Sequence, residues 1–163
     1  GKSFCMDLFY DHATVTKRRW HFHEFMLSTH ERLHKLKVKG GFEGNPLTVV
    51  AREISQETGQ LLCFDEFQVT DIGDAMILKK LLETLFACGT SVVFTSNRPP
   101  GDLYLNGLNR HLFIPCIKML EDTTRVVHLD HDKDYRSLKM SQTGACADVY
   151  IFPASSPEAR IAV

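Results

Sequence analysis

Two apolar runs that end in polar residues constrain the fold of this chain more than any other feature. "LLCFDE" (Leu61–Glu66) ends in two acids, and "TSVVFTSN" (Thr90–Asn97) ends in a polar turn before two prolines. Continuous apolar runs of this length are typical of strands buried on both faces of a sheet. Between them the sequence predicts a helix that Asp71 caps and Gly89 ends. Buried strands alternating with helices predict an α/β domain with a parallel sheet.

The rest of the chain continues this alternation. Apolar residues at helical spacing in "HEFMLSTHERLHKLK" predict an amphipathic helix, whose buried face holds Phe22, Phe25, Met26, Leu33 and Leu36. The other expected elements are a helix in "SFCMDLFYDH", a strand at Arg18–Phe22, a loop at Lys37–Pro46, a helix from Pro46 or Leu47 to about Glu57, a helix within "NGLNRHLFIPCIKMLED", a buried strand at Thr124–Leu129, an edge strand or hairpin at "DVYIFP" and a helix start in "SSPEARIAV".

Length and composition exclude several classes of protein. A chain of 163 residues with 44% hydrophobic residues is long enough for one domain with a sizeable core. The net charge of −1 gives no reason to expect direct nucleic-acid binding. Because the longest apolar runs are far shorter than the roughly 20 residues that span a bilayer, we expect no transmembrane segment. Without any C-x-x-C motif, the cysteines are expected to be reduced core thiols: Cys5, Cys63, Cys88, Cys116 and Cys146.

The chain begins with Gly1-Lys2-Ser3, the last three residues of a phosphate-binding loop. In such a loop, backbone N–H groups approach the phosphates, the lysine contacts the β and γ oxygens, and the serine binds Mg²⁺. Taken alone, the tripeptide is weak evidence. The glycines and the strand that precede it in the full motif are absent, so we expect the chain to be a piece of a longer protein. We also expect these 163 residues alone to bind ATP weakly or not at all.

Acidic and polar residues follow the two buried strands where a nucleotide hydrolase needs them. Asp65 and Glu66 come directly after the first strand, and Asn97 follows the second. One acid can hold the Mg²⁺ shell and a second can polarise the attacking water. An acid pair also serves as a solvated strand end, and Asn97 before two prolines also fits a simple turn. Together with Gly1-Lys2-Ser3, these residues favour a nucleotide hydrolase.

Longer motifs of the sequence resemble one known family. "HFHEFM", "LLCFDEFQVTDIGDAMILKKLLETLF" and "TSNRPPGDLYLNGLNRHLFIPCI" are similar to the AAA+ ATPases that comprise bacterial ZapE and the mitochondrial AFG-type ATPases. The resemblance covers about residues 1–136 in family order, whereas "SLKMSQTGACADVYIF" matches only loosely. "FQVTDI" and "TSNRPP" are closer to the eukaryotic branch, so the resemblance implies a mitochondrial protein.

The resemblance assigns residues that bind the nucleotide and its metal. It implies that Gly1, Lys2 and Ser3 belong to the Walker A motif and bind ATP. It also makes Asp65 the first acid of Walker B, which holds Mg²⁺ together with Ser3. The implied cofactors are therefore ATP and Mg²⁺.

The resemblance also implies the residues that carry out hydrolysis. Glu66 corresponds to the second Walker B acid and Asn97 to the sensor-1 residue, which would activate and position water. Arg110 corresponds to an arginine that is a candidate finger for a neighbouring subunit's γ-phosphate, which implies a ring-like homo-oligomer. Arg110 is also compatible with a role as a surface helix residue.

The fold and function expected from these observations are those of a partial AAA+ ATPase. Residues 1–163 are expected to be a P-loop NTPase core, a parallel sheet sandwiched by helices and truncated at both ends, without the first strand, most of the P-loop and the C-terminal lid. The resemblance implies Mg²⁺-dependent ATP hydrolysis coupled to remodelling or turnover of client proteins. A nucleotide-dependent scaffold without productive hydrolysis is the alternative.

A second motif points to a different class of enzyme. His30, Glu31 and His34 form H-E-x-x-H, the pattern in which two histidines bind zinc and the glutamate activates water. Helical projection places His30 at the margin of the apolar face and Glu31 on the solvent side, and spacing suggests no third ligand. We therefore disfavour a zinc metalloprotease. The basic run "TKRRW" fits a solvated strand entrance better than a nucleic-acid contact.

Overall fold

The computed structural model describes residues 1–129. By its internal contacts the chain divides after His128 into two units, and the unit Gly1–His128 holds the fold described below. Its elements, in chain order, are α1 (Lys2–His12), β1 (Lys17–His21), α2 (Phe22–Lys39), α3 (Pro46–Thr58), β2 (Leu61–Asp65), α4 (Ile72–Ala87), β3 (Ser91–Phe94), the short 3₁₀ helix η1 (Pro100–Asp102) and α5 (Arg110–Thr123).

The three described strands form one parallel sheet in the order β1-β2-β3. The register aligns Arg19 of β1 with Cys63 of β2, and Cys63 in turn with Val93 of β3. Helices α2 and α3 connect the first two strands, and α4 connects β2 to β3. The expected α/β fold of the P-loop NTPase type, with its parallel sheet between helices, is thereby confirmed.

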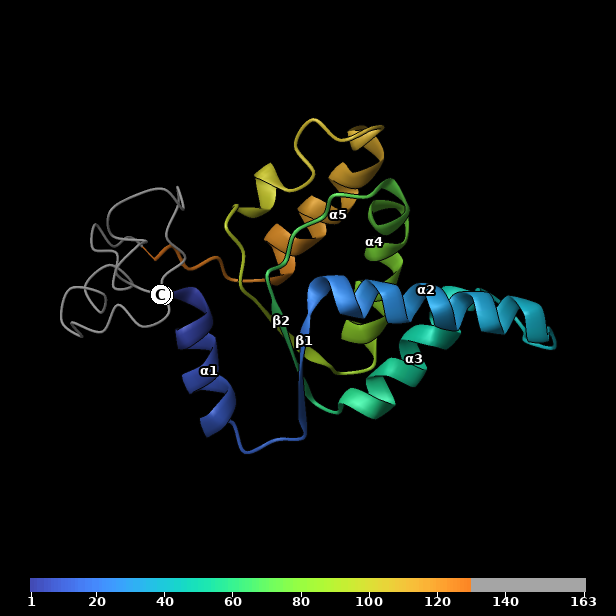
Figure 1. Ribbon diagram of the computed structural model, residues 1–163, viewed down its shortest axis with the longest axis horizontal. Coiled ribbons are helices and arrows are strands. Elements are labelled where there is room, and N and C mark those ends of the chain that lie inside the picture. The colour runs from blue at the N-terminus through green and yellow to red at the C-terminus, as the bar shows by residue number, and fades with distance from the viewer. Residues whose placement is uncertain (130–163) are drawn as a thin grey trace, which may run out of the picture. The chain divides into compact units, whose positions relative to one another are not determined.

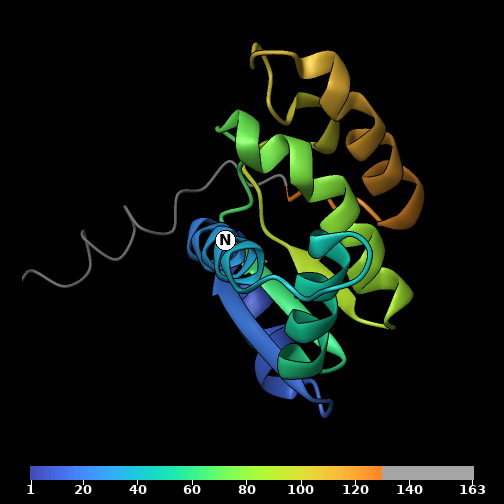
Figure 2. The same cartoon turned by 90° about the vertical axis from the view of Figure 1, so that its right-hand side faces the viewer.

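The two faces of the sheet are covered by different helices. Side chains alternate along β2, so Leu62 and Phe64 enter the large core formed with α2, α3, α4 and α5. On the other face, Leu61 and Cys63 pack against Met6 of α1. Figure 1 shows α1 on one side of the strands and α2 and α3 on the other, and Figure 2 shows α4 and α5 packed side by side. Asp65 therefore faces α1.

Local signals explain where the helices begin and end. Asn45 caps α3 by accepting a hydrogen bond from the backbone N–H of Leu47, and Pro46 occupies the first turn, where no N–H is needed. The predicted cap of α4 is confirmed, because the Asp71 carboxylate accepts from the Gly73 N–H at 2.6 Å. Gly89 follows the end of α4 with φ of 84°, a conformation that favours glycine.

The amphipathic pattern of α2 correctly predicted its buried face. Phe22, Phe25, Met26 and Leu33 are buried in the large core, and Leu36 packs against it half-buried. Thus the 3.6-residue periodicity identified the side of this helix that contacts the sheet.

The predicted buried strand at Thr124–Leu129 is wrong. No strand is present at residues 124–129, and Val126 and Val127 are 56% and 69% exposed. A β-branched run fits a strand only when a neighbouring strand supplies hydrogen bonds, and the described residues provide none there. The predictions at "DVYIFP" and "SSPEARIAV", and Cys146, lie outside the described residues.

None of the helices within residues 1–129 combines the length and the hydropathy that a membrane span requires.

Candidate functional site

The start of α1 and the end of β2 meet at a hydrogen bond. The Ser3 hydroxyl donates to Oδ1 of Asp65 at 3.0 Å, although the two residues are 62 positions apart. Ser3 lies in the first turn of α1, and Asp65 is the last residue of β2. The structure therefore brings together the two residues expected to hold Mg²⁺.

The Asp65 carboxylate is buried and surrounded by donors. Besides Ser3, the Thr95 hydroxyl donates to Oδ1 at 2.6 Å, and the Arg19 guanidinium donates to Oδ2 at 2.5 Å. Burial by itself would raise the pKa of Asp65, but the hydrogen bonds from Thr95, Arg19 and Ser3 outweigh it and lower that pKa below its usual value. Asp65 is consequently an anion at neutral pH.

Arg19 extends this cluster to a second acid. Its Nη1 atom donates to the carboxylate of Asp7, which lies on α1 four residues after Ser3. Residues four apart share one face of a helix. Ser3 thus contacts Asp65, Asp7 contacts Arg19, and Arg19 in turn contacts Asp65, so the four side chains link α1, β1 and β2.

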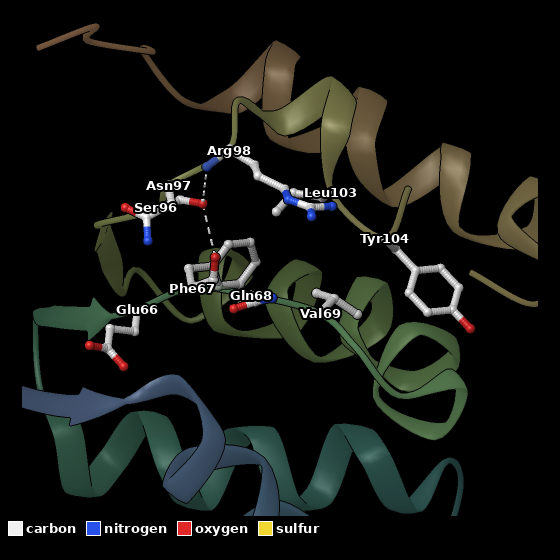
Figure 3. Close-up of a pocket in the computed structure, with 9 residues that line it drawn as sticks. All are labelled: Glu66, Phe67, Gln68, Val69, Ser96, Asn97, Arg98, Leu103 and Tyr104. Atoms are coloured by element: carbon white, nitrogen blue, oxygen red, sulfur yellow. Dashed lines mark hydrogen bonds between the residues drawn. The ribbon is translucent and has the colours of Figure 1, made fainter. Parts of the chain in front are cut away.

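A cavity of about 400 Å³ lies beside this cluster, beyond the carboxyl ends of β2 and β3. Figure 3 shows it between the segment Glu66–Val69 and the loop Ser96–Arg98, with Leu103 and Tyr104 at one end. The Ser96 hydroxyl joins the two segments by donating to the Phe67 carbonyl at 2.9 Å. Glu66 and Asn97, the two residues expected to act on water, both line the cavity and are exposed to solvent.

Glu66 has an unusual backbone conformation. Its φ is 55°, in the left-handed region that non-glycine residues rarely adopt. The Glu66 N–H donates to Thr95 Oγ1 at 3.1 Å, and the same hydroxyl donates to Asp65. Thr95 therefore fixes both acids relative to β3.

The remaining predicted site residues are Gly1, Lys2 and Arg110. Gly1 caps α1, and Lys2 is exposed in its first turn. Arg110 begins α5 and is not among the residues that line the cavity. Its Nη2 atom donates to the Gly101 carbonyl at 2.5 Å, and its buried Nε atom has no hydrogen-bond partner in the described part of the chain.

Sequence reasoning missed two members of the cluster, Arg19 and Thr95. Arg19 belongs to the basic run predicted to be a solvated strand entrance, and Thr95 begins the polar segment at the end of the second buried strand, in which only Asn97 is predicted to have a role. In a parallel register, Arg19 shares a face with Cys63 and hence with Asp65, two residues further along β2. The alternation of side chains along β1 places Arg19 on the face of Asp65 only if the pairing of β1 with β2 is already known.

The H-E-x-x-H motif lies on α2. The His30 Nε2 atom lies 2.7 Å from Oδ1 of Asp74 on α4, and His34 is exposed. No group of three or more His, Cys, Asp or Glu residues within residues 1–129 is arranged to hold a metal ion. The motif instead contributes a contact between α2 and α4.

The expectation of core cysteines holds for only part of the set. Cys63 and Cys116 are buried, and burial raises the pKa of the Cys116 thiol to about 12. Cys5 and Cys88 are exposed, because each lies on the solvent side of a helix or at its end. All four are free thiols.

Comparison with known proteins adds an independent observation to this geometry. The sequence profile of AFG1-like ATPases matches residues 1–158. The chain belongs to the AFG1-like ATPase family. Membership in an ATPase family indicates nucleotide binding, which fits a helix start beside two acids at the end of a buried strand.

The AFG1-like chain has similar relatives in yeast, fish and bacteria. It is 47% identical over its whole length to an uncharacterized protein of Schizosaccharomyces pombe, and 48% identical over its whole length to lactation elevated protein 1 homolog B of Danio rerio. It is 44% identical over 87% of its length to the cell division protein ZapE of Escherichia coli K12. The aligned parts cover 36%, 33% and 37% of these relatives, so the chain spans about a third of their length. No solved structure matches the chain.

Proposed function

We propose that these residues form the core of an AAA+ domain that binds ATP with Mg²⁺ and hydrolyses it. The observation that carries the proposal is the hydrogen bond between Ser3 and Asp65. It brings the N-terminus of a helix, where free N–H groups favour anionic phosphate, to a buried carboxylate. Hydroxyl and carboxylate oxygens are ligands that suit Mg²⁺, directly or through water.

Each residue of the proposed site has a distinct task. Lys2 contacts the β- and γ-phosphates from the first turn of α1, where no acidic side chain opposes them. Ser3 and Asp65 hold Mg²⁺, which when bound neutralises the charge on the phosphate oxygens. Glu66 accepts the proton of the attacking water, and Asn97 orients that water from across the cavity.

The test compares two exposed acids, Glu66 and Glu53, in the full-length protein. Glu66→Gln is expected to keep ATP binding and to lower kcat at least about 100-fold, the usual contribution of a general base. Glu53→Gln, an exposed acid on α3, is the matched control and should leave both unchanged. Phosphate release and calorimetric ATP binding provide the two measurements.

The outcomes separate the proposed hydrolase from the alternative scaffold. If Glu66→Gln hydrolysed ATP at the wild-type rate, the proposed catalytic role of Glu66 would be wrong. ATP binding without Mg²⁺-dependent phosphate release in the wild type would favour a nucleotide-dependent scaffold instead. A protein that binds no nucleotide would contradict both.

We further propose that Arg110 acts in trans within a homo-oligomer. In support, Arg110 begins α5, is partly exposed and does not line the cavity that holds Glu66 and Asn97. Arg110→Ala should lower kcat in the assembled protein. Adding Glu66→Gln subunits, which keep Arg110, should partly restore hydrolysis by the Arg110→Ala subunits.

The cellular setting is proposed from the motifs and relatives of the eukaryotic branch. We propose a mitochondrial ATPase that remodels or turns over client proteins. Microscopy of the tagged full-length protein tests the location, and ATP-trapped Glu66→Gln provides bait that should retain clients by holding the bound state.

A further inference from the structure

Arg19 is the one side chain of the Ser3–Asp65 cluster that contacts acids on two different elements. Nη2 donates to Oδ2 of Asp65 at 2.5 Å, and Nη1 donates to the carboxylate of Asp7 on α1. The Arg19 side chain is 34% exposed, whereas that of Asp65 is 6% exposed. The guanidinium therefore covers a buried carboxylate from the solvent side.

We propose that Arg19 is a positioning residue that orients the metal-binding pair Ser3 and Asp65. This inference rests on the proposed function of that pair. Arg19 occupies Oδ2 and so fixes the rotation of the carboxylate, which leaves Oδ1 facing the hydroxyls of Ser3 and Thr95. A planar guanidinium can hold two acceptors in a fixed geometry, which an ammonium group cannot.

The packing of α1 explains why such a residue is needed. Met6 is buried against the sheet and Tyr10 packs beside it half-buried, but Phe4, Leu8 and Phe9 are 63%, 48% and 49% exposed. Apolar contacts therefore leave the rotation and sliding of α1 on the sheet weakly specified. The contact of Arg19 with Asp7, one turn after Ser3, fixes the helix relative to the same carboxylate that Ser3 contacts.

A competing role for Arg19 makes the opposite prediction. If its guanidinium only occupied the place of Mg²⁺ near Asp65, removing it would lower the Mg²⁺ concentration needed for nucleotide binding. If Arg19 positions the pair, removing it raises that concentration. Losing a residue that orients a metal ligand typically weakens metal affinity by about 10- to 100-fold.

The experiment measures binding of a fluorescent ATP analogue to the full-length protein at increasing Mg²⁺ and, separately, in EDTA. Arg19→Gln should raise the half-saturating Mg²⁺ concentration about tenfold and leave binding in EDTA unchanged. Arg19→Lys should give a smaller rise, since it keeps the charge without the bridge. Asp7→Asn should also give a smaller rise, because it removes one end only.

Arg18→Gln is the matched control. Arg18 is the neighbouring cation on β1, but it lies over Trp20 and pairs with Glu57 at 3.4 Å, away from Asp65. Its removal should leave the Mg²⁺ dependence unchanged. Hydrogen exchange of the metal-free protein gives a readout without nucleotide, in which α1 amides should exchange faster in Arg19→Gln and Asp7→Asn and not in Arg18→Gln.

Each outcome decides between the inference and the function on which it rests. If the wild type binds no nucleotide with Mg²⁺, the proposed function fails. If the wild type binds and Arg19→Gln behaves like Arg18→Gln, or needs less Mg²⁺, the positioning role is wrong. Equal loss of binding in EDTA and Mg²⁺ would indicate a structural defect instead. If Arg19→Gln does not fold, Asp7→Asn and Arg19→Lys still test the role.

Discussion

The two faces of the sheet are held by different kinds of interaction. On one face, α2 to α5 bury a continuous apolar core around Phe64 of β2. On the other, α1 contributes Met6 and the half-buried Tyr10 to a small cluster with Leu61 and Cys63, and polar contacts join α1 to the strands beside it. The Ser3–Asp65 pair of the candidate site lies on the polar face. We infer that the large core supplies stability, whereas the α1 face sets the geometry of the site and can change it at small cost to the fold.

The largest expected effect comes from the core. Phe64 is fully buried and its ring contacts those of Phe22, Phe25, Phe67 and Phe94. Phe64→Ala should lower the free energy of unfolding by about 3–5 kcal/mol, because it removes buried apolar area and leaves a cavity. Hydrogen exchange of the β2 and α4 amides in the full-length protein measures the change.

Phe4→Ala on the opposite face is the control for this substitution. Phe4 is 63% exposed on α1, so its truncation should change the stability by no more than about 0.5 kcal/mol. A comparable loss in the two variants would show that α1 is part of the main core, and the contrast between the faces would not hold.

The core side of the fold was largely predictable from sequence. The strands at Leu61–Asp65 and Ser91–Phe94 and the cap at Asp71 carry local signals, namely an apolar run or a capping side chain next to it. The run at Thr124–Leu129 carried the same local signal and forms no strand. What distinguishes them is pairing with a neighbour, which is a property of the tertiary structure and not of the run itself.

The polar side was predictable only in part. Ser3 and Asp65 were paired by their chemistry, since a metal needs both, and the structure places them 3.0 Å apart. Arg19 and Thr95 could not be found this way, because no motif gave either residue a role and their contacts depend on strand register. The roles of Glu66, Asn97 and Arg110 stay predictions for the experiments above.

An intermediate effect is expected where Lys17 holds the end of α1. Its ammonium group donates to the backbone carbonyls of Tyr10 and, at 2.9 Å, of Ala13. A cation there stabilises the carbonyls that a helix leaves unpaired at its C-terminus. Lys17→Met should therefore lower the opening free energy of α1 by about 1–2 kcal/mol, with the core unchanged.

Local hydrogen exchange checks this prediction, because it reports α1 and α4 separately. Lys79→Met is the control, since Lys79 pairs with Glu83 one turn away on the same helix, α4, and both side chains are half-exposed. That pair contributes at most about 0.5 kcal/mol. Protection of α1 that is equal in Lys17→Met and wild type would mean that polar contacts do not hold this helix.

The smallest effect on stability is expected for the ion pair between Arg32 and Glu57, which joins two helices of the apolar-core face. Arg32 of α2 donates to both carboxylate oxygens of Glu57 on α3, at 2.6 and 2.8 Å, and these hydrogen bonds lower the pKa of Glu57. Both side chains are partly exposed, so Glu57→Gln should cost less than about 1 kcal/mol at pH 7. On this face, apolar packing already fixes the two helices.

The pH dependence of the Glu57 pair tests its origin. A lowered pKa in the folded state means that the stabilisation is present above the unfolded Glu pKa of about 4.3 and is lost as the pH falls through the folded value. Urea unfolding should therefore give a higher free energy of unfolding for wild type than for Glu57→Gln at pH 7. This difference in free energy should shrink as the pH falls. Glu83→Gln on α4 serves as the control. A difference in the free energy of unfolding above about 2 kcal/mol would exceed what an exposed ion pair contributes. Polar pairs would then stabilise both faces of the sheet, and the contrast between the two faces would be lost.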